Sequence, residues 1–250
     1  MLLVLTILAG VLLFIAEKKF PANHMPSVKG WYPRAAIFNL LPLPFLLLAG
    51  LTWEPWLRMH ALFELHGLPP AIGGLLGFIA FQFTFYWWHR LRHNNKFLWR
   101  SLHQLHHSAQ RLEVLTAYYA HPLDFTLNLL LSGSVLYGVM GLSVEGVAWF
   151  ALIEGAYDYF THANIATPHW LGYFVQRPEM HRVHHEYQLH KNNYALPIWD
   201  KLFGTYSNPI TSPARCGFDE EKETEVSAML LMVDVHHVKP WRCCGWQSQT

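Results

Sequence analysis

Three short segments of the chain place histidines at the spacing of metal ligands. Residues three or four positions apart lie on one face of a helix, so each segment directs two or three imidazoles to the same side. Neutral imidazole is a common ligand for transition metals, and a structural role rarely requires such clustering. The eight histidines of these segments are His89, His93, His103, His106, His107, His181, His184 and His185.

The number of imidazoles indicates more than one metal ion. A structural zinc site closes with four ligands, and eight imidazoles exceed that requirement. The economical interpretation is a two-metal centre built from helix faces. Ligand type leaves Fe, Zn, Cu and Ni open, although the lack of thiolates in the segments disfavours Cu(I) and iron–sulfur chemistry. Two irons would allow dioxygen to attack an unactivated C–H bond, whereas zinc would offer a polarised water.

A second polar pattern lies within an apolar stretch. Glu154, Asp158 and His162 follow one another at four-residue intervals and therefore share one helix face. Gln82 lies on a similar stripe that leads to His89. Ionisable groups in apolar segments are costly and usually face an interior or a functional cavity. We expect His162 to be a ninth metal ligand and Asp158 to hold an imidazole through its other ring nitrogen.

Other histidines lack this spacing. Adjacent residues do not share a helix face, so the pair at positions 236 and 237 is left out of the predicted centre. We expect the following to be loop, interface or turn residues: His24, His60, His66, His169 and His190.

The composition is typical of a membrane-embedded protein. Of the 250 residues, 52% are hydrophobic and 14% are charged, whereas soluble domains carry about 25% charged residues. The net charge of +1 gives no indication of nucleic-acid binding. Cys216, Cys243 and Cys244 form neither a disulfide framework nor a zinc motif, so we expect reduced thiols.

Five apolar runs are candidate membrane helices, since about 20 residues cross a bilayer. Positive charge follows the first run rather than preceding it, which favours a retained helix over a signal peptide. Pro42 and Pro44 are expected to kink the second run. The last two runs are separated by a tight link and form either a hairpin or a pair too short to cross. The runs cover residues 1–16, 35–51, 68–88, 125–142 and 144–160.

The distribution of basic residues supports this layout. With the N-terminus outside, every Lys and Arg except Arg58 falls on the cytoplasmic side, as the positive-inside rule requires. The histidine segments then lie on the cytoplasmic side too. We expect residues 96–110 to form an amphipathic helix at the interface and Pro178 to begin another helix.

The expected fold is therefore all-α. It is an integral membrane bundle of about four to five membrane-embedded helices with a helical, histidine-rich cytoplasmic cap. We divide the chain into N-terminal membrane helices and linker (1–70), a catalytic domain (71–206) and a C-terminal tail (207–250), within a single structural unit. The compact length and the lack of an obvious retrieval signal favour a bacterial inner membrane over the endoplasmic reticulum.

In these residues the chain resembles the fatty acid hydroxylase superfamily, which includes sterol desaturases and C-4 sterol methyl oxidases. The resemblance extends from Phe81 to Tyr206, about half of the chain, and rests on motifs that occur in the family's order. These are YWWHRLRH (86–93), LWRSLHQLHHS (98–108), HP (121–122), HAN (162–164), PEMHRVHH (178–185) and NYALPIWDKLFGTY (193–206).

The resemblance implies a membrane-bound, non-haem diiron enzyme of lipid metabolism, with the nine histidines above as ligands and zinc as a substitute metal. Such enzymes hydroxylate, desaturate or cleave lipid-like substrates (fatty acyl chains, sterols and related molecules). They use dioxygen and an external electron donor, which would be cytochrome b5-like or ferredoxin-like and served by a reductase. It also implies outer positions around the metals for His121, Asn193 and Asp200.

Two positions depart from the family pattern. Tyr119 stands where an arginine is common, and Ala195 where a glycine is usual. Neither change removes a ligand, so they bear on substrate contacts or packing. From the residues alone, two other functions stay open: a zinc-dependent membrane hydrolase, which would need neither oxygen nor reductant, and a non-catalytic metal-handling membrane protein.

Overall fold

The computed structural model describes residues 1–236. Apart from one isolated bridge between Glu186 and Cys216, the regular structure in this part of the chain is helical. The longer helices are α1 (Leu2–Lys19), α2 (Trp31–Leu40), α3 (Pro42–Leu51), α4 (Trp53–Met59), α5 (Pro70–Asn94), α8 (Pro122–Gly133) and α9 (Val144–His162). The short helices are α6 (Lys96–Leu98), α7 (Gln104–Ser108), α10 (Pro178–His184), α11 (Pro197–Leu202), α12 (Glu220–Glu223) and α13 (Val226–Leu230).

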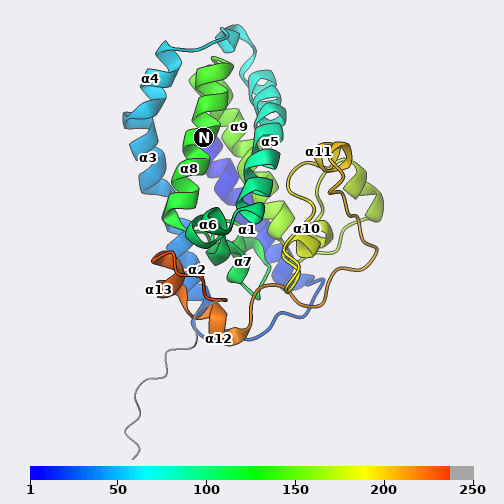
Figure 1. Cartoon of the computed structure of the whole chain (residues 1–250). Coiled ribbons are helices and arrows are strands. Elements are labelled where there is room, and N and C mark those ends of the chain that lie inside the picture. Colours follow the sequence, from blue (N-terminus) through cyan, green and yellow to red (C-terminus); the bar gives the residue numbers. More distant parts are fainter. Residues whose placement is uncertain (237–250) are drawn as a thin grey trace, which may run out of the picture.

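The long helices form a bundle whose centre is α9, which packs against both α1 and α5 (Figure 1). Small residues allow these close approaches. A Cβ atom at Gly74 of α5 would lie 2.5 Å from Trp149 Cβ, and one at Gly155 of α9 would lie 2.5 Å from Thr6 Cγ2. The hydrophobic effect and this tight packing together fix how α5 and α9 present their ends.

All five predicted apolar runs are helical. The second is divided at Leu41 into α2 and α3, with Pro42 at the start of α3; Leu41 itself has helical dihedral angles, so the predicted kink stays a prediction. The fourth begins as α8 and continues as a π-helical segment, η4 (Ser134–Val139). A second π-helical segment, η2 (Trp99–His103), joins α6 to α7.

Two helical stretches in the described residues are long and apolar enough to cross a membrane, by length and composition. They are Trp31–Leu51, which combines α2 and α3, and Pro70–Asn94, which is α5. Leucines on α3 are exposed on the molecular surface; the exposed fraction is 69% for Leu47 and 81% for Leu51. An apolar surface of this kind is suited to lipid contact.

The short helices α6, α7, α12 and α13 lie towards the lower end of the bundle in Figure 1, whereas α10 and α11 lie to the right of α5. Helix α10 starts at Pro178, as predicted, because proline at the first helical position loses no hydrogen bond. Within the predicted C-terminal tail, Phe218, Met229 and Val235 are buried in the core that includes Trp31 and Leu105. Residues 207–236 therefore complete the packing at this end. Cys216 is buried and free, while Cys243 and Cys244 lie outside the described residues.

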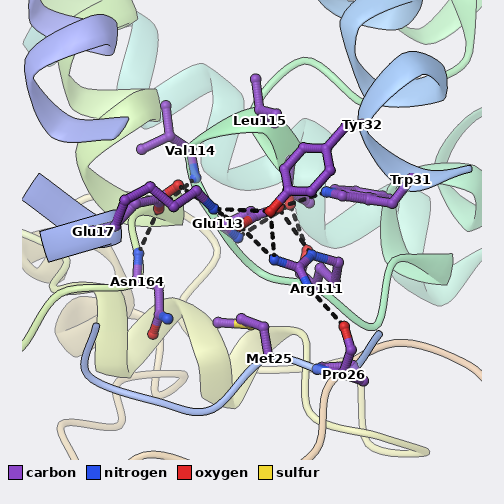
Figure 2. Close-up of polar contacts among 12 residues, drawn as sticks. Glu17, Met25, Pro26, Trp31, Tyr32, Arg111, Glu113, Val114, Leu115 and Asn164 are labelled. Carbon is purple, nitrogen blue, oxygen red and sulfur yellow. Dashed lines mark hydrogen bonds and ion pairs between the residues drawn. The ribbon is translucent and has the colours of Figure 1, made fainter. Parts of the chain in front are cut away.

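A buried polar network fastens α1 to this end of the bundle (Figure 2). Glu17 Oε2 accepts hydrogen bonds from the backbone N–H groups of Val114 and Asn164, each at 3.0 Å. Glu113 accepts from Trp31 Nε1 at 2.5 Å and forms an ion pair with Arg111 at 3.0 Å. Because buried carboxylates need such partners, the network fixes α1 beside the segments that follow α7 and α9.

Candidate metal centre

Nine histidines, distant in sequence, meet at the end of the bundle where α6 and α7 lie. They form two groups, and within each group the candidate ligand atoms all lie within 4.8 Å of one another. The first group is His89, His93, His103, His107 and His184. The second group is His106, His162, His181 and His185. These are the nine histidines singled out in the sequence.

Two of the three segments divide their histidines between the groups. His103 and His107 belong to the first group and His106 to the second, whereas His184 belongs to the first and His181 to the second. At about 100° per residue, position i+4 is offset from position i by about 40° and position i+3 by about 60° to the other side, so one helix face can serve two neighbouring sites. The sequence analysis expected each segment to point one way, and the structure corrects this for both segments.

The two groups lie against each other. The ring of His107 stacks on that of His185, with centroids 4.1 Å apart and planes 15° apart. The ring of His106 also lies 4.7 Å from His185. Two cations held by these groups would therefore be neighbours.

Backbone carbonyls fix the orientation of several rings by accepting from Nδ1. A proton held on Nδ1 leaves the Nε2 lone pair free for a metal, which is the usual outer-shell arrangement around ligating histidine. The carbonyl acceptors are Tyr194 for His89 (2.7 Å), Asn192 for His184 (2.7 Å), Asp158 for His162 (2.8 Å) and Tyr119 for His106 (3.3 Å).

Burial keeps these imidazoles neutral. His107, His184 and His185 have no exposed surface, and desolvation lowers the pKa of His184 to about 3. Burial likewise places the pKa values of His107 and His185 well below the usual range, and neighbouring histidines lower them further. Neutral imidazole is the form that binds a metal.

The donor set fits cations. Nε2 of His103 lies 2.9 Å from Nε2 of His89 and 3.2 Å from that of His107. In the second group, Nε2 of His181 lies 3.0 Å from that of His162. Nε2 of His184 is buried and has no hydrogen-bond partner among residues 1–236. One proton cannot satisfy several converging lone pairs, whereas one cation can.

The predicted outer residues have distinct placements. Asp158 holds His162 through its backbone carbonyl rather than its carboxylate. Asp200 accepts from the N–H groups of Tyr194 and Ala195 at 2.9 and 3.1 Å, and so positions the loop whose Tyr194 carbonyl supports His89.

The other two predicted outer residues have backbone partners. Asn193 donates to the carbonyls of Met180 and Ser207, both at 2.8 Å, which ties the loop to α10. His121 caps the start of α8 by accepting from Leu123 N, and its other ring nitrogen faces the Leu230 carbonyl.

Sequence reasoning missed at least three side chains that contact the histidines: Asp124, His190 and Gln176, whose Nε2 lies 3.2 Å from Nδ1 of His181. Asp124 lies 3.1 Å from Nδ1 of His103 and also pairs with Arg92. The sequence feature that could have revealed Asp124 is a single carboxylate at the start of an apolar run. His190 was expected in a loop, and it does lie in one, but its Nδ1 faces Nδ1 of His107 at 3.2 Å. Its φ of +44° is uncommon for a residue other than glycine, and no spacing rule would have revealed it.

A cavity of about 540 Å³ adjoins both groups of histidines. His89 and His103 of the first group and His162 and His181 of the second contribute to its wall. Away from the histidines the wall is mostly apolar and comes from α1, α3, α5, α8 and α9. A volume of this size accommodates a ligand with a long apolar part.

The family model for fatty acid hydroxylases matches residues 74–205. The chain belongs to the fatty acid hydroxylase family. The match covers the end of the bundle that holds all nine histidines. It confirms the family resemblance found in the sequence motifs.

The chain is similar to several curated proteins whose names refer to lipids. It is 33% identical to the ornithine lipid hydroxylase OlsE of Rhizobium tropici, over 62% of this chain and 48% of that protein. It is 27% identical to the sphingolipid C4-hydroxylase sur2 of Schizosaccharomyces pombe, over 56% and 50%. It is 30% identical to the alkylglycerol monooxygenase of Danio rerio, over 53% and 30%. The matches span about half or less of each relative's length, and no solved structure matches the chain.

Proposed function

We propose that this protein is a membrane-bound diiron oxygenase that hydroxylates or desaturates a lipid-like substrate with dioxygen and external electrons. The observation that carries the proposal is the apolar cavity that ends at two adjacent histidine groups. The names of the relatives refer to lipids of several classes, which supports a lipid substrate without choosing one.

Each histidine group would hold one iron. His89, His93, His103, His107 and His184 would hold the first, and His106, His162, His181 and His185 the second. When bound, the two irons supply the activation of dioxygen and the oxidation of a C–H bond. Carbonyl acceptors at Nδ1 keep the rings oriented, so little reorganisation is needed when a substrate enters.

The cavity wall would orient the lipid and exclude water. Phe81 and Phe85 of α5 line it on the side that leads to His89. An apolar, dry wall limits side reactions of a strong oxidant and holds an unreactive hydrocarbon close to the centre. The protein's contribution is thus to position the chain and to keep the site closed to water.

The proposed setting is a multi-pass arrangement with the histidine groups on the cytoplasmic side, in a bacterial inner membrane. Its support is the pair of span-length helices, the exposed leucines of α3 and the placement of basic residues. A cytosolic donor, cytochrome b5-like or ferredoxin-like with its reductase, would then reach the end of the molecule that holds the irons.

The test is a comparison of purified iron-loaded protein with the variants His106→Ala and His107→Ala, using a lipid extract, a reductant system and oxygen. We expect about two irons per chain and a product heavier by one oxygen or lighter by two hydrogens. His66→Ala is the matched control, because His66 is exposed and lies outside both groups. Turnover that persists without oxygen would indicate a zinc hydrolase, and metal binding without turnover a metal-handling protein.

A further inference from the structure

A cluster of polar side chains interrupts the apolar wall of the cavity on the faces of α5 and α9 that lead to the histidines. Gln82 of α5 donates its amide to both carboxylate oxygens of Glu154 on α9, at 3.0 and 2.9 Å. Gln82 is 1% exposed, and its Oε1 has no hydrogen-bond partner in the part of the chain that the structure describes. Both side chains line the cavity.

Asp158 adds a further carboxylate one helical turn from Glu154, and it too lines the cavity. Among residues 1–236, no ion pair includes Glu154 or Asp158. Arg92 is the one Lys or Arg in the described wall of the cavity; it forms its ion pair with Asp124 through Nη1, and its Nε and Nη2 have no hydrogen-bond partner among residues 1–236. The acceptors therefore face the cavity without a cationic partner from the protein.

Such a cluster is costly to leave unmatched inside an apolar cavity. Buried acceptors without donors lose solvation and regain nothing. A polar residue at this place in an apolar helix usually serves a ligand or a functional cavity. The cluster offers Glu154, Gln82 Oε1 and Asp158 as acceptors; the Gln82 amide is used by Glu154, and the one unpartnered hydroxyl beside them among residues 1–236 is that of Tyr157.

We propose that Glu154, Gln82 and Asp158 bind the primary ammonium group of an amine-bearing lipid. An ammonium carries three donors and a positive charge, which matches three acceptor side chains and the lack of a protein cation. That this lipid is the oxidised substrate rests on the proposed function. Glu154 lies eight residues and Asp158 four residues before His162, or about 12 and 6 Å along the helix, so the amine would bind on the face of α9 that leads to the second histidine group.

Equilibrium binding tests the proposal without oxygen or reductant. The full chain in detergent is titrated with hexadecylamine, hexadecanol and hexadecane, followed by intrinsic fluorescence and by the ligand-induced rise in the unfolding midpoint. At pH 7 the amine is protonated. We expect the wild type to prefer the amine over the alcohol by about tenfold or more, and Glu154→Gln to abolish this preference while still binding the alcohol.

Glu145→Gln is the matched control, since Glu145 lies on α9 but is exposed and does not line the cavity. It should retain the full preference. Alcohol binding by Glu154→Gln shows that the cavity is intact, so a folding defect is separable from a lost contact. Equal affinity of the wild type for amine and alcohol, or an unchanged preference in Glu154→Gln, would overturn the proposal. If the enzyme oxidises only lipids that lack an amine, in an oxygen-dependent reaction, the proposed oxygenase function is supported and the proposed amine site is refuted.

Discussion

Asp124 accepts a hydrogen bond from Nδ1 of His103 at 3.1 Å and, through its other oxygen, pairs with Arg92. The carboxylate thereby fixes both the ring orientation and the tautomer of one histidine in the first group. The pairing with Arg92 satisfies the rest of the buried charge, as such a carboxylate requires.

Replacing Asp124 by Asn should weaken metal retention. The amide loses the charge that makes the His103 ring a better ligand, and outer-shell changes of this kind typically cost about 10- to 100-fold in metal affinity. Iron content after dialysis against graded chelator measures the effect. The variant Asp219→Asn, at a half-buried position before α12 and outside both histidine groups, should retain wild-type iron content, and equal retention by Asp124→Asn would contradict the assigned role.

His190 should act on the first group through His107. Asn tolerates a positive φ better than most residues, so His190→Asn keeps the loop conformation while removing the ring that faces His107. We expect the affinity for the first metal to fall by about tenfold and the overall fold to persist. Competition with a metal-binding dye measures this affinity. If the metal affinity of His190→Asn equals that of the control His66→Asn, the contact between His190 and His107 does not contribute to metal binding.

Metal removal should destabilise the protein. Ions bound to the folded state alone stabilise it by mass action, by about 2.7 kcal/mol at a free concentration one hundred times the dissociation constant. Unfolding midpoints of the iron-loaded protein before and after chelation provide the comparison, with iron added back as the control. Identical midpoints would mean that the histidine groups do not bind metal in the folded state.

The burial of Glu223 should make the free energy of unfolding depend on pH. Burial raises its pKa to about 7 from an ordinary value of 4.5, despite its ion pair with Arg34 at 3.0 Å. The folded state thus holds this proton more tightly than the unfolded state. The resulting stabilisation is complete below pH 4.5 and is lost as the pH rises to 7, on the order of 3 kcal/mol. Glu223→Gln should flatten that part of the curve of unfolding free energy against pH, whereas the exposed Glu221→Gln should leave its slope unchanged.

Gly74→Ala should destabilise the bundle through overpacking. The added methyl would lie 2.5 Å from Trp149 Cβ and 2.8 Å from the Phe150 backbone nitrogen, and neither atom can move without shifting α9. The expected loss is about 1–3 kcal/mol. Gly50→Ala provides the control, because its methyl would meet only Glu54 Oε2 at 3.9 Å. If thermal unfolding of both variants matches the wild type, α5 and α9 do not pack this closely.

Much of this architecture could be predicted because it depends on local patterns. The five apolar runs are helices, a new helix starts at Pro42, and the nine histidines chosen by spacing meet in space. Local spacing could not show how the segments divide between two groups, since that depends on how α7 and α10 face each other. It also could not reveal His190, whose position depends on a left-handed backbone in the loop after α10.

The division of histidines between the groups has a consequence for biosynthesis. The first group needs His184 and the second needs His185, while both also draw on the segment that ends at residue 108. Neither cluster can be completed until the chain has been synthesised beyond residue 184. Any metal bound by these groups should therefore enter after α10 has been made, into a pocket that the earlier helices have already shaped.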